Sequence, residues 1–174
     1  MAANQYRHYI AFVDGGCTNN GQAHAEAYGS FVVFDITNKE QDILGGPNGA
    51  PIAEKVQELF PLLESRRFRV NGLLEGQLRP TNNMAEAASM YSLLTSMEKT
   101  GIFKEANVDI YCDSELIVKQ MKGIYRISNK VLQKIHPHIR AVMLQIMAQT
   151  KRTATEMVGL HHYPGDQMKK VLGH

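Results

Sequence analysis

The segment YIAFVDGGCTNNG, residues 9–21, begins with apolar side chains and then stops on an aspartate that is followed by glycines and asparagines. A run rich in aromatic and β-branched residues predicts a buried strand over 9–13. Asp14, at its end, has two interpretations. It can begin a turn, because aspartate bonds to nearby backbone, or it can bind a metal ion at the tip of a central strand. The second interpretation requires other acidic residues that converge on Asp14.

The rest of the sequence predicts an α/β sheet of mixed direction. YGSFVVFDI, residues 28–36, forms a hairpin with the first strand, since the segment between them is polar and contains glycine. RFRVNGLL, residues 67–74, alternates polar and apolar side chains as a third strand would. VDIYCD, residues 108–113, lies between expected helices, which implies a crossover and parallel pairing. The other expected elements are helices over 52–66, with a break or kink at Pro61, over 81–100, 114–121 and 131–147, and a last strand over 153–162.

The composition is that of one soluble domain. With 174 residues and 44% hydrophobic content, the chain can bury a sizeable core. The balance of 19 Lys and Arg against 17 Asp and Glu gives a net charge of +2, too small to establish a nucleic-acid partner. Cys17 and Cys112 match neither a zinc site nor a disulfide framework. The polar N-terminus and the lack of an apolar run of about 20 residues predict a cytoplasmic protein that does not enter a membrane, and we expect a monomer.

Two further acidic residues are placed to join Asp14. Glu86 falls in the first turns of a long expected helix, and Asp113 ends the fourth expected strand. Each has a structural alternative, since Asn83 and Glu86 have the spacing of a capping box and Asp113 can cap the helix that follows it. Parallel neighbouring strands would place Asp14 and Asp113 at one edge of the sheet, and the helix could bring Glu86 over them.

Three clustered carboxylates indicate metal-dependent chemistry. They repel one another and raise each other's pKa unless a cation compensates their charge. Hard oxygen ligands suit Mg²⁺ or Mn²⁺. Because Mg²⁺ keeps several waters and completes its shell with phosphate oxygens, the cluster points to phosphoryl chemistry rather than to a closed structural site. In two-metal sites one ion activates the attacking water and the other stabilises the leaving oxygen, so no side-chain nucleophile is needed.

Three motifs, taken together and in this order, resemble the type 1 ribonuclease H family. They are VDGGCTNNG at 13–21, TNNMAE at 81–86 and YCDSELIVKQMKG at 111–123. GIYRISNKVLQKI, at 123–135, is similar to the family's segment before its long helix. The resemblance extends from about Tyr9 to the C-terminus. It implies a single ribonuclease H-like domain over 1–174, an α/β fold with a five-stranded mixed sheet flanked by helices, in which strands one to three are antiparallel and strands four and five are parallel to strand one.

The resemblance also implies an activity, namely a metal-dependent endonuclease that hydrolyses the RNA strand of an RNA/DNA hybrid with two Mg²⁺ or Mn²⁺ ions and leaves 5′-phosphate ends. Asp14, Glu86 and Asp113 correspond to its catalytic, metal-binding carboxylates. Gly15 and Gly16 are expected to permit close approach of the backbone to the substrate. Other positions correspond to contacts with the hybrid, where 2′-hydroxyl groups distinguish RNA from DNA. These positions are Asn20, Thr81 and Asn82 or Asn83.

The C-terminal segment departs from the family pattern. Family members carry a fourth carboxylate at the start of a C-terminal helix, and alignment on Pro164 places Leu172 near that position. His174, two residues beyond, is a candidate fourth catalytic metal ligand that would favour Mn²⁺, and its alternative is a solvated terminus. Asp166 is the other candidate, although it falls early.

Other features of the family are altered or absent. His161 and His162 are candidates for the loop histidine that assists product release, although alternation along a strand makes one of them core or surface. The tryptophan-rich basic protrusion is missing, because the chain has no Trp. Segment 45–66 is expected to be an insertion before the third strand. Basic residues near the missing protrusion form either a face toward the DNA strand or a solvated helix face; they are Lys119, Lys122, Arg126, Lys130 and Lys134.

Two alternatives to ribonuclease H activity stay open. One is a nuclease of the same fold that cuts another nucleic acid, and the other is a hybrid-binding module with impaired catalysis. The three acidic residues argue against the binding module, whereas the missing fourth carboxylate argues for it. A proofreading-type exonuclease is disfavoured, because its first motif places a second acid two residues after the first, and this chain has Gly16 there.

Overall fold

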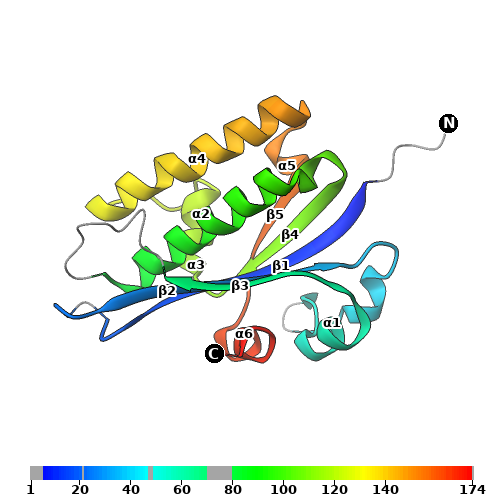
Figure 1. Cartoon of the computed structure of the whole chain (residues 1–174), viewed down its shortest axis with the longest axis horizontal. Coiled ribbons are helices and arrows are strands. Elements are labelled where there is room, and N and C mark those ends of the chain that lie inside the picture. The colour runs from blue at the N-terminus through cyan, green and yellow to red at the C-terminus, as the bar shows by residue number, and fades with distance from the viewer. Residues whose placement is uncertain (1–5, 21, 47–48, 70–79, 174) are drawn as a thin grey trace.

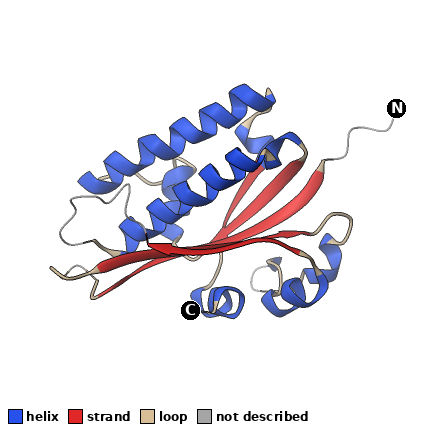
Figure 2. Ribbon diagram, viewed as in Figure 1, coloured by secondary structure: helices blue, strands red, loops and turns tan. Residues whose placement is uncertain are grey.

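The computed structural model describes residues 6–20, 22–46, 49–69 and 80–173. Its centre is a five-stranded sheet of order β3-β2-β1-β4-β5 with helices on both faces (Figure 1; Figure 2). The first three strands pair antiparallel, and the last two run parallel to β1. This confirms the predicted sheet and its strand directions. The bounds are β1 Arg7–Thr18, β2 Glu26–Asp35, β3 Leu62–Arg69, β4 Ala106–Cys112 and β5 Val158–His162.

The central strand β1 is buried on both faces. Ala11 and Val13 belong to one core, and Ile10 and Phe12 belong to the other. A strand with both faces covered reads as a continuous apolar run, which is why residues 9–13 show no alternation. The strand then continues through Asp14 and the glycines to Thr18. It is therefore longer than the apolar run alone predicts.

The helices form one layer on each side of the sheet (Figure 1). The larger core lies under α2, α3 and α4, and the smaller core lies under α1 and α6. Among the described residues, no helix combines the length and the apolar character that crossing a membrane requires. The bounds are α1 Ala53–Leu59, α2 Asn82–Thr100, α3 Glu115–Met121, α4 Lys130–Thr150, α5 Ala154–Met157 and α6 Gly165–Leu172, with short 3₁₀ turns at Glu40–Ile43 and Ile102–Lys104.

The predicted helix over 52–66 and the strand that follows it are wrong in their bounds. Helix α1 ends at Leu59, and β3 already begins at Leu62. Pro61 ends the helix because it lacks an N–H group, and its carbonyl accepts from the Asp35 amide (3.4 Å) at the end of β2. The insertion expected at 45–66 therefore stops before β3, and residues 70–74 of the predicted strand lie outside the described part of the chain.

The predicted last strand over 153–162 is half correct. The Thr153 side chain accepts from the Glu156 amide, so one turn of helix, α5, forms before β5 starts at Val158. Helices α2, α3 and α4 agree with their predicted ranges, whereas α6 forms where no helix range was predicted. Gly101 ends α2 in the left-handed conformation (φ 72°), which is the stop that the sequence indicates.

Segment 45–66 supports the C-terminal helix. The Gln57 side-chain amide donates to the Val171 carbonyl of α6 (2.9 Å), and the Tyr163 hydroxyl donates to the Pro51 carbonyl (2.7 Å). Lys170 of α6 pairs with Glu54 of α1 (2.9 Å). These contacts give the insertion a structural role, because they fix α6 against the lower face of the sheet in Figure 1.

Candidate active site

Asp14, Glu86 and Asp113 line one cavity of about 210 Å³. The parallel register of β1 and β4 pairs Val13 with Cys112, so the next residue of each segment is an aspartate at the same edge of the sheet. Helix α2 crosses above this edge and supplies Glu86, whose side chain is buried. The structure thus brings together the three acids that the sequence singles out. The other lining residues are Gly15, Gly16, Tyr28, Asn82, Gly165 and Lys169.

Neither helix-capping alternative for these acids holds. Thr81, rather than Asn83, caps α2, and its hydroxyl accepts from the Met84 amide (3.4 Å). Ser114, rather than Asp113, caps α3, and its hydroxyl accepts from the Ile117 amide (3.3 Å). Because other side chains cap these helices, Asp113 and Glu86 face the cavity.

Gly15 and Gly16 make room for this chain's own atoms. A Cβ on Gly15 would lie 2.4 Å from the Ala85 carbonyl oxygen, so the glycine lets α2 approach the backbone of β1. A Cβ on Gly16 would lie 2.5 Å from the Tyr28 hydroxyl, which belongs to the paired residue on β2. The space brings Glu86 and Tyr28 to the site. Both glycines also line the cavity, so close approach of their backbone to the substrate stays a prediction.

The close approach of the acids shifts their proton affinities. Burial and the neighbouring Asp113 carboxylate raise the pKa of Asp14 to about 7. Burial, followed by hydrogen bonding to Asp113 and its charge, raises the pKa of Glu86 to about 11. Both shifts have the direction expected when carboxylates are clustered without a compensating cation.

Cys112 orients one of these carboxylates. Its thiol donates to Glu86 Oε2 (3.4 Å), and burial raises the pKa of the thiol. The ligand atoms of Glu86, Cys112 and Asp113 lie within 4.8 Å of one another. A protonated thiol is a poor ligand, because the thiolate is the form that binds metals. The oxygen atoms rather than the thiol are thus the atoms of this cluster that could hold a metal, and the Cys112 hydrogen bond orients Glu86.

The donor set fits a hard divalent cation. Within the described ranges, Asp113 Oδ1 is a buried oxygen that has no hydrogen-bond partner. Leaving a buried carboxylate oxygen unpaired is costly, and a bound cation removes that cost. Carboxylate oxygens from Asp14, Glu86 and Asp113 suit Mg²⁺ or Mn²⁺ by size and hardness.

The residues expected to contact the hybrid lie at the rim of the cavity. Asn20 Oδ1 accepts from the Asn82 amide (2.8 Å), and Asn82 Oδ1 accepts from the Cys17 amide (2.7 Å). These bonds join the turn after β1 to the start of α2. Asn82 lines the cavity, and Asn83 is exposed beside it. Asn20 and Thr81 therefore hold the local backbone, whatever else they contact.

The two histidines of β5 have different surroundings. His161 donates to Asp109 Oδ1 (2.7 Å) and stacks on the Tyr111 ring. Both partners belong to β4, ahead of Asp113. His162 is exposed and donates from Nε2 to the Asp113 carbonyl (3.2 Å). Of these two, His162 is the one next to the acidic cavity.

Of the two candidate fourth ligands, only Asp166 can be placed, and it is not among the described residues that line this cavity. Leu172 packs against the core below the sheet, so the alignment that placed it at the fourth position does not describe the site. Asp166 is exposed in the first turn of α6, and His174 lies outside the described residues. Lys169 lines the cavity instead. Sequence reasoning missed Lys169 and Tyr28, although hairpin pairing of Gly16 with Tyr28 gives a signal for the tyrosine.

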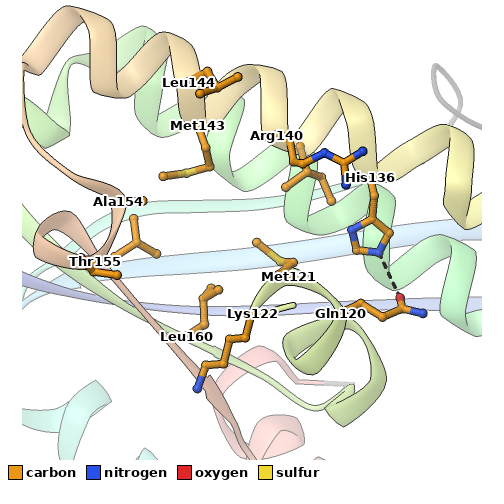
Figure 3. Close-up of a pocket in the computed structure, with 12 residues that line it drawn as sticks. Gln120, Met121, Lys122, His136, Arg140, Met143, Leu144, Ala154, Thr155 and Leu160 are labelled. Carbon is orange, nitrogen blue, oxygen red and sulfur yellow. Dashed lines mark hydrogen bonds between the residues drawn. The ribbon is translucent and has the colours of Figure 1, made fainter. Parts of the chain in front are cut away.

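A larger cavity, of about 510 Å³, lies between α3, α4 and β5 (Figure 3). No carboxylate is found among the described residues that line it. At one end His136 donates to Gln120 Oε1 (3.0 Å), and methionine and leucine side chains surround the rest. Lys122, one of the basic residues at 119–134, borders this cavity rather than the acidic one. The described lining of this larger cavity therefore differs from the three-carboxylate set of the acidic cavity.

Comparison with known proteins establishes the fold. Neither the models of known protein families nor the curated protein sequences gave a match. Among solved structures, LC11-RNase H1 in complex with an RNA/DNA hybrid is similar with a TM-score of 0.60 and 20% identity, over 91% of this chain and 87% of that one. The N-terminal RNase H domain of Rv2228c from Mycobacterium tuberculosis has a TM-score of 0.59, 18% identity and coverages of 94% and 92%. RNase H1 from Halobacterium salinarum has a TM-score of 0.58 and 16% identity, over 94% of this chain and 90% of that one. The chain therefore has the ribonuclease H fold.

Proposed function

We propose that this protein is a metal-dependent endonuclease that hydrolyses the RNA strand of RNA/DNA hybrids. The observation that carries the proposal is the convergence of Asp14, Glu86 and Asp113 in one cavity of a ribonuclease H fold. The buried Asp113 oxygen that has no hydrogen-bond partner in the described part of the chain supports a cation at this position. The hybrid bound to LC11-RNase H1 supports the choice of substrate.

The chain's own residues have separate tasks in this reaction. Asp14, Glu86 and Asp113 would hold Mg²⁺ or Mn²⁺, and the Cys112 thiol keeps Glu86 oriented through its hydrogen bond. When bound, the metal supplies activation of a water molecule and stabilisation of the leaving oxygen. Tyr28, on the wall of the cavity, offers a hydroxyl to the phosphate backbone.

RNA would be recognised at the rim. Asn82 and Asn83 begin α2 next to the acids, where their side-chain amides can bond to 2′-hydroxyl groups, which only the RNA strand carries. The bonds from Asn20 to Asn82 and from Asn82 to Cys17 make this rim rigid. A pre-organised rim reduces the entropy that is lost when the hybrid binds.

Lys169 favours a second candidate function. Among the residues that the structure describes, the cavity holds this lysine and no fourth carboxylate. A cation at that position suits a module that binds the hybrid without turning it over. The retained trio of acids favours the enzyme, since a binding module does not need them.

One assay separates these functions. Labelled RNA/DNA, RNA/RNA and DNA/DNA duplexes are incubated with the protein and Mg²⁺ or Mn²⁺, with Asp14→Asn as the control for contaminating nucleases. Cleavage of the RNA strand of RNA/DNA alone, absent in the variant, is the expected result. Equal cleavage of all three duplexes would favour a nuclease of broader substrate range. Binding of RNA/DNA without cleavage under either metal would favour the binding module.

A further inference from the structure

Helix α6 directs Lys169 toward the acids. Gly165 and Lys169 are one turn apart on one face of this helix, and both line the acidic cavity. Gly165 lies beside Asp113, since a Cβ there would be in van der Waals contact with Asp113 Oδ2 (3.4 Å). On other faces, Met168 and Val171 are buried in the core below the sheet. The orientation of α6 is thus set by packing, and it presents Lys169 to the cavity.

The neighbouring lysine shows that this placement is specific. Lys170 pairs with Glu54 of α1 (2.9 Å), on the side away from the acids. Lys169 is exposed and has no ion-pair partner in the described ranges. One lysine therefore fastens α6 to α1, while the other lines the acidic cavity.

A positive charge at this point acts in opposite directions on two partners. It attracts a phosphate group, to which lysine offers a compact charge with three donors. It also repels a divalent cation that approaches the same carboxylates. Because Lys169 is exposed, water and salt screen both effects in part.

We infer that Lys169 is a substrate-binding residue that contacts a non-bridging phosphate oxygen at the acidic cavity and lowers the affinity of the three carboxylates for divalent cations. The phosphate is identified as part of a nucleic-acid strand only through the proposed function, on which this inference rests. In this arrangement the Lys169 ammonium group places a positive charge beside the phosphate, on the side of the cavity that α6 forms.

The test compares Lys169→Ala with Lys169→Arg, and uses Lys170→Ala as the matched control on the same helix turn. Binding of a labelled RNA/DNA hybrid is measured by fluorescence anisotropy in EDTA, where no cleavage occurs. Loss of one charged hydrogen bond should weaken binding roughly 10-fold in Lys169→Ala and reduce the slope of log K against log salt by about 0.9. Lys169→Arg should retain most of the affinity, and Lys170→Ala should match the wild type.

Binding of Mn²⁺ to the free protein is measured by calorimetry, without nucleic acid. Here Lys169→Ala should bind Mn²⁺ several-fold more tightly than the wild type, whereas Lys169→Arg and Lys170→Ala should not. Equal hybrid affinity of Lys169→Ala and Lys170→Ala overturns the phosphate contact. Equal Mn²⁺ affinity of the same two variants overturns the competition with metal.

Failure of the inference is distinguishable from failure of the proposed function. If the wild type leaves RNA/DNA intact with either metal, the nuclease proposal fails, and the Mn²⁺ titration still decides the effect of Lys169 on the carboxylates. If the wild type cleaves and Lys169→Ala behaves like Lys170→Ala in both binding experiments, the nuclease stands and the inference fails. Thermal melting of each variant checks that the fold is intact.

Discussion

The backbone carbonyl of Ala85 on α2 lies so close to Gly15 on β1 that a Cβ on Gly15 would be 2.4 Å from its oxygen. The next residue of α2 is Glu86, which is buried with 7% of its surface exposed. The glycine therefore sets how deeply α2 sits on the sheet, and with it the position of one carboxylate of the site.

Replacing Gly15 by alanine should push α2 away from β1. Overpacking against backbone costs about 1–3 kcal/mol, and the displaced Glu86 should lower metal affinity and cleavage together. Gly16→Ala is the comparison, because its new methyl group meets the side chain of Tyr28 instead of backbone. Urea unfolding and cleavage rates measure both effects. A smaller loss for Gly15→Ala than for Gly16→Ala would contradict this account.

Asp14→Asn should abolish cleavage with little change in folding. The substitution keeps the shape and removes a metal-binding charge from a cluster in which burial and Asp113 raise the pKa of Asp14. The melting temperature of the metal-free protein should hold or rise, because fewer carboxylates repel one another. Turnover near the wild-type rate would refute the assignment of Asp14 as a metal ligand.

Stability of the metal-free protein should fall as pH rises. An unfolded Asp titrates near pH 4, whereas burial and Asp113 raise the pKa of Asp14 to about 7 in the folded protein. Between about pH 4 and 7 the folded state therefore binds more protons than the unfolded state, and the free energy of unfolding decreases with pH across this window. The raised pKa of Glu86 acts in the same direction.

Unfolding in urea, measured in EDTA at several pH values, checks this dependence. The decrease should be smaller in Asp14→Asn, which no longer titrates at this position, and saturating Mn²⁺ should reverse it in the wild type. Parallel pH profiles for wild type and variant would show that Asp14 does not titrate as described.

The asparagines at the rim should affect substrate binding more than chemistry. Asn83→Ala should raise KM with kcat nearly unchanged and leave stability intact, since no hydrogen bond of its side chain is seen in the described structure. Asn20→Ala should raise KM and also lower stability, because it breaks the bond to the Asn82 amide (2.8 Å). Steady-state kinetics and thermal melting measure the two effects. A pure kcat effect in Asn83→Ala would argue against a role in binding.

Thr81 needs a different substitution, because it caps α2. Thr81→Ala should lose about 0.5–2 kcal/mol of stability in addition to raising KM. Thr81→Ser keeps the capping oxygen, so it should restore stability. If Thr81→Ser leaves KM at the value of Thr81→Ala, the methyl group contributes to substrate binding.

The tail offers a test of the fourth ligand. Asp166 is exposed and does not line the cavity, so Asp166→Asn should be silent in cleavage. If His174 is a ligand, deletion of residues 173–174 should reduce activity far more than stability, and His174→Asp should shift preference from Mn²⁺ toward Mg²⁺. Cleavage rates of each variant with Mg²⁺ and with Mn²⁺ show which residue is the fourth ligand. Loss of activity in Asp166→Asn with a silent deletion would reverse the assignment, and two silent variants would leave three carboxylates sufficient.

Local pattern alone located most of the secondary structure and the three acids. The apolar run at 9–13, the helical spacing after Thr81 and the strand ending at Asp113 each predict an element whose identity depends on neighbours in sequence. Their order implied a mixed sheet, and parallel pairing of the strands before Asp14 and Asp113 then placed both aspartates at one edge. The bounds of β3 were beyond this reasoning, because Leu62 looks like a helix residue until it pairs with Phe34 of β2.

The tertiary structure decided the features that depend on contacts between distant segments. Thr81 caps α2 and Ser114 caps α3, so Glu86 and Asp113 do not cap these helices and face the cavity instead. Tyr28 and Lys169 entered the cavity only because β2 pairs with β1 and because the segment at 51–57 holds α6. A pattern of apolar and polar residues determines which side of an element is buried. The charged side chains that become neighbours are decided by the packing angles and positions of the helices, which no single segment encodes.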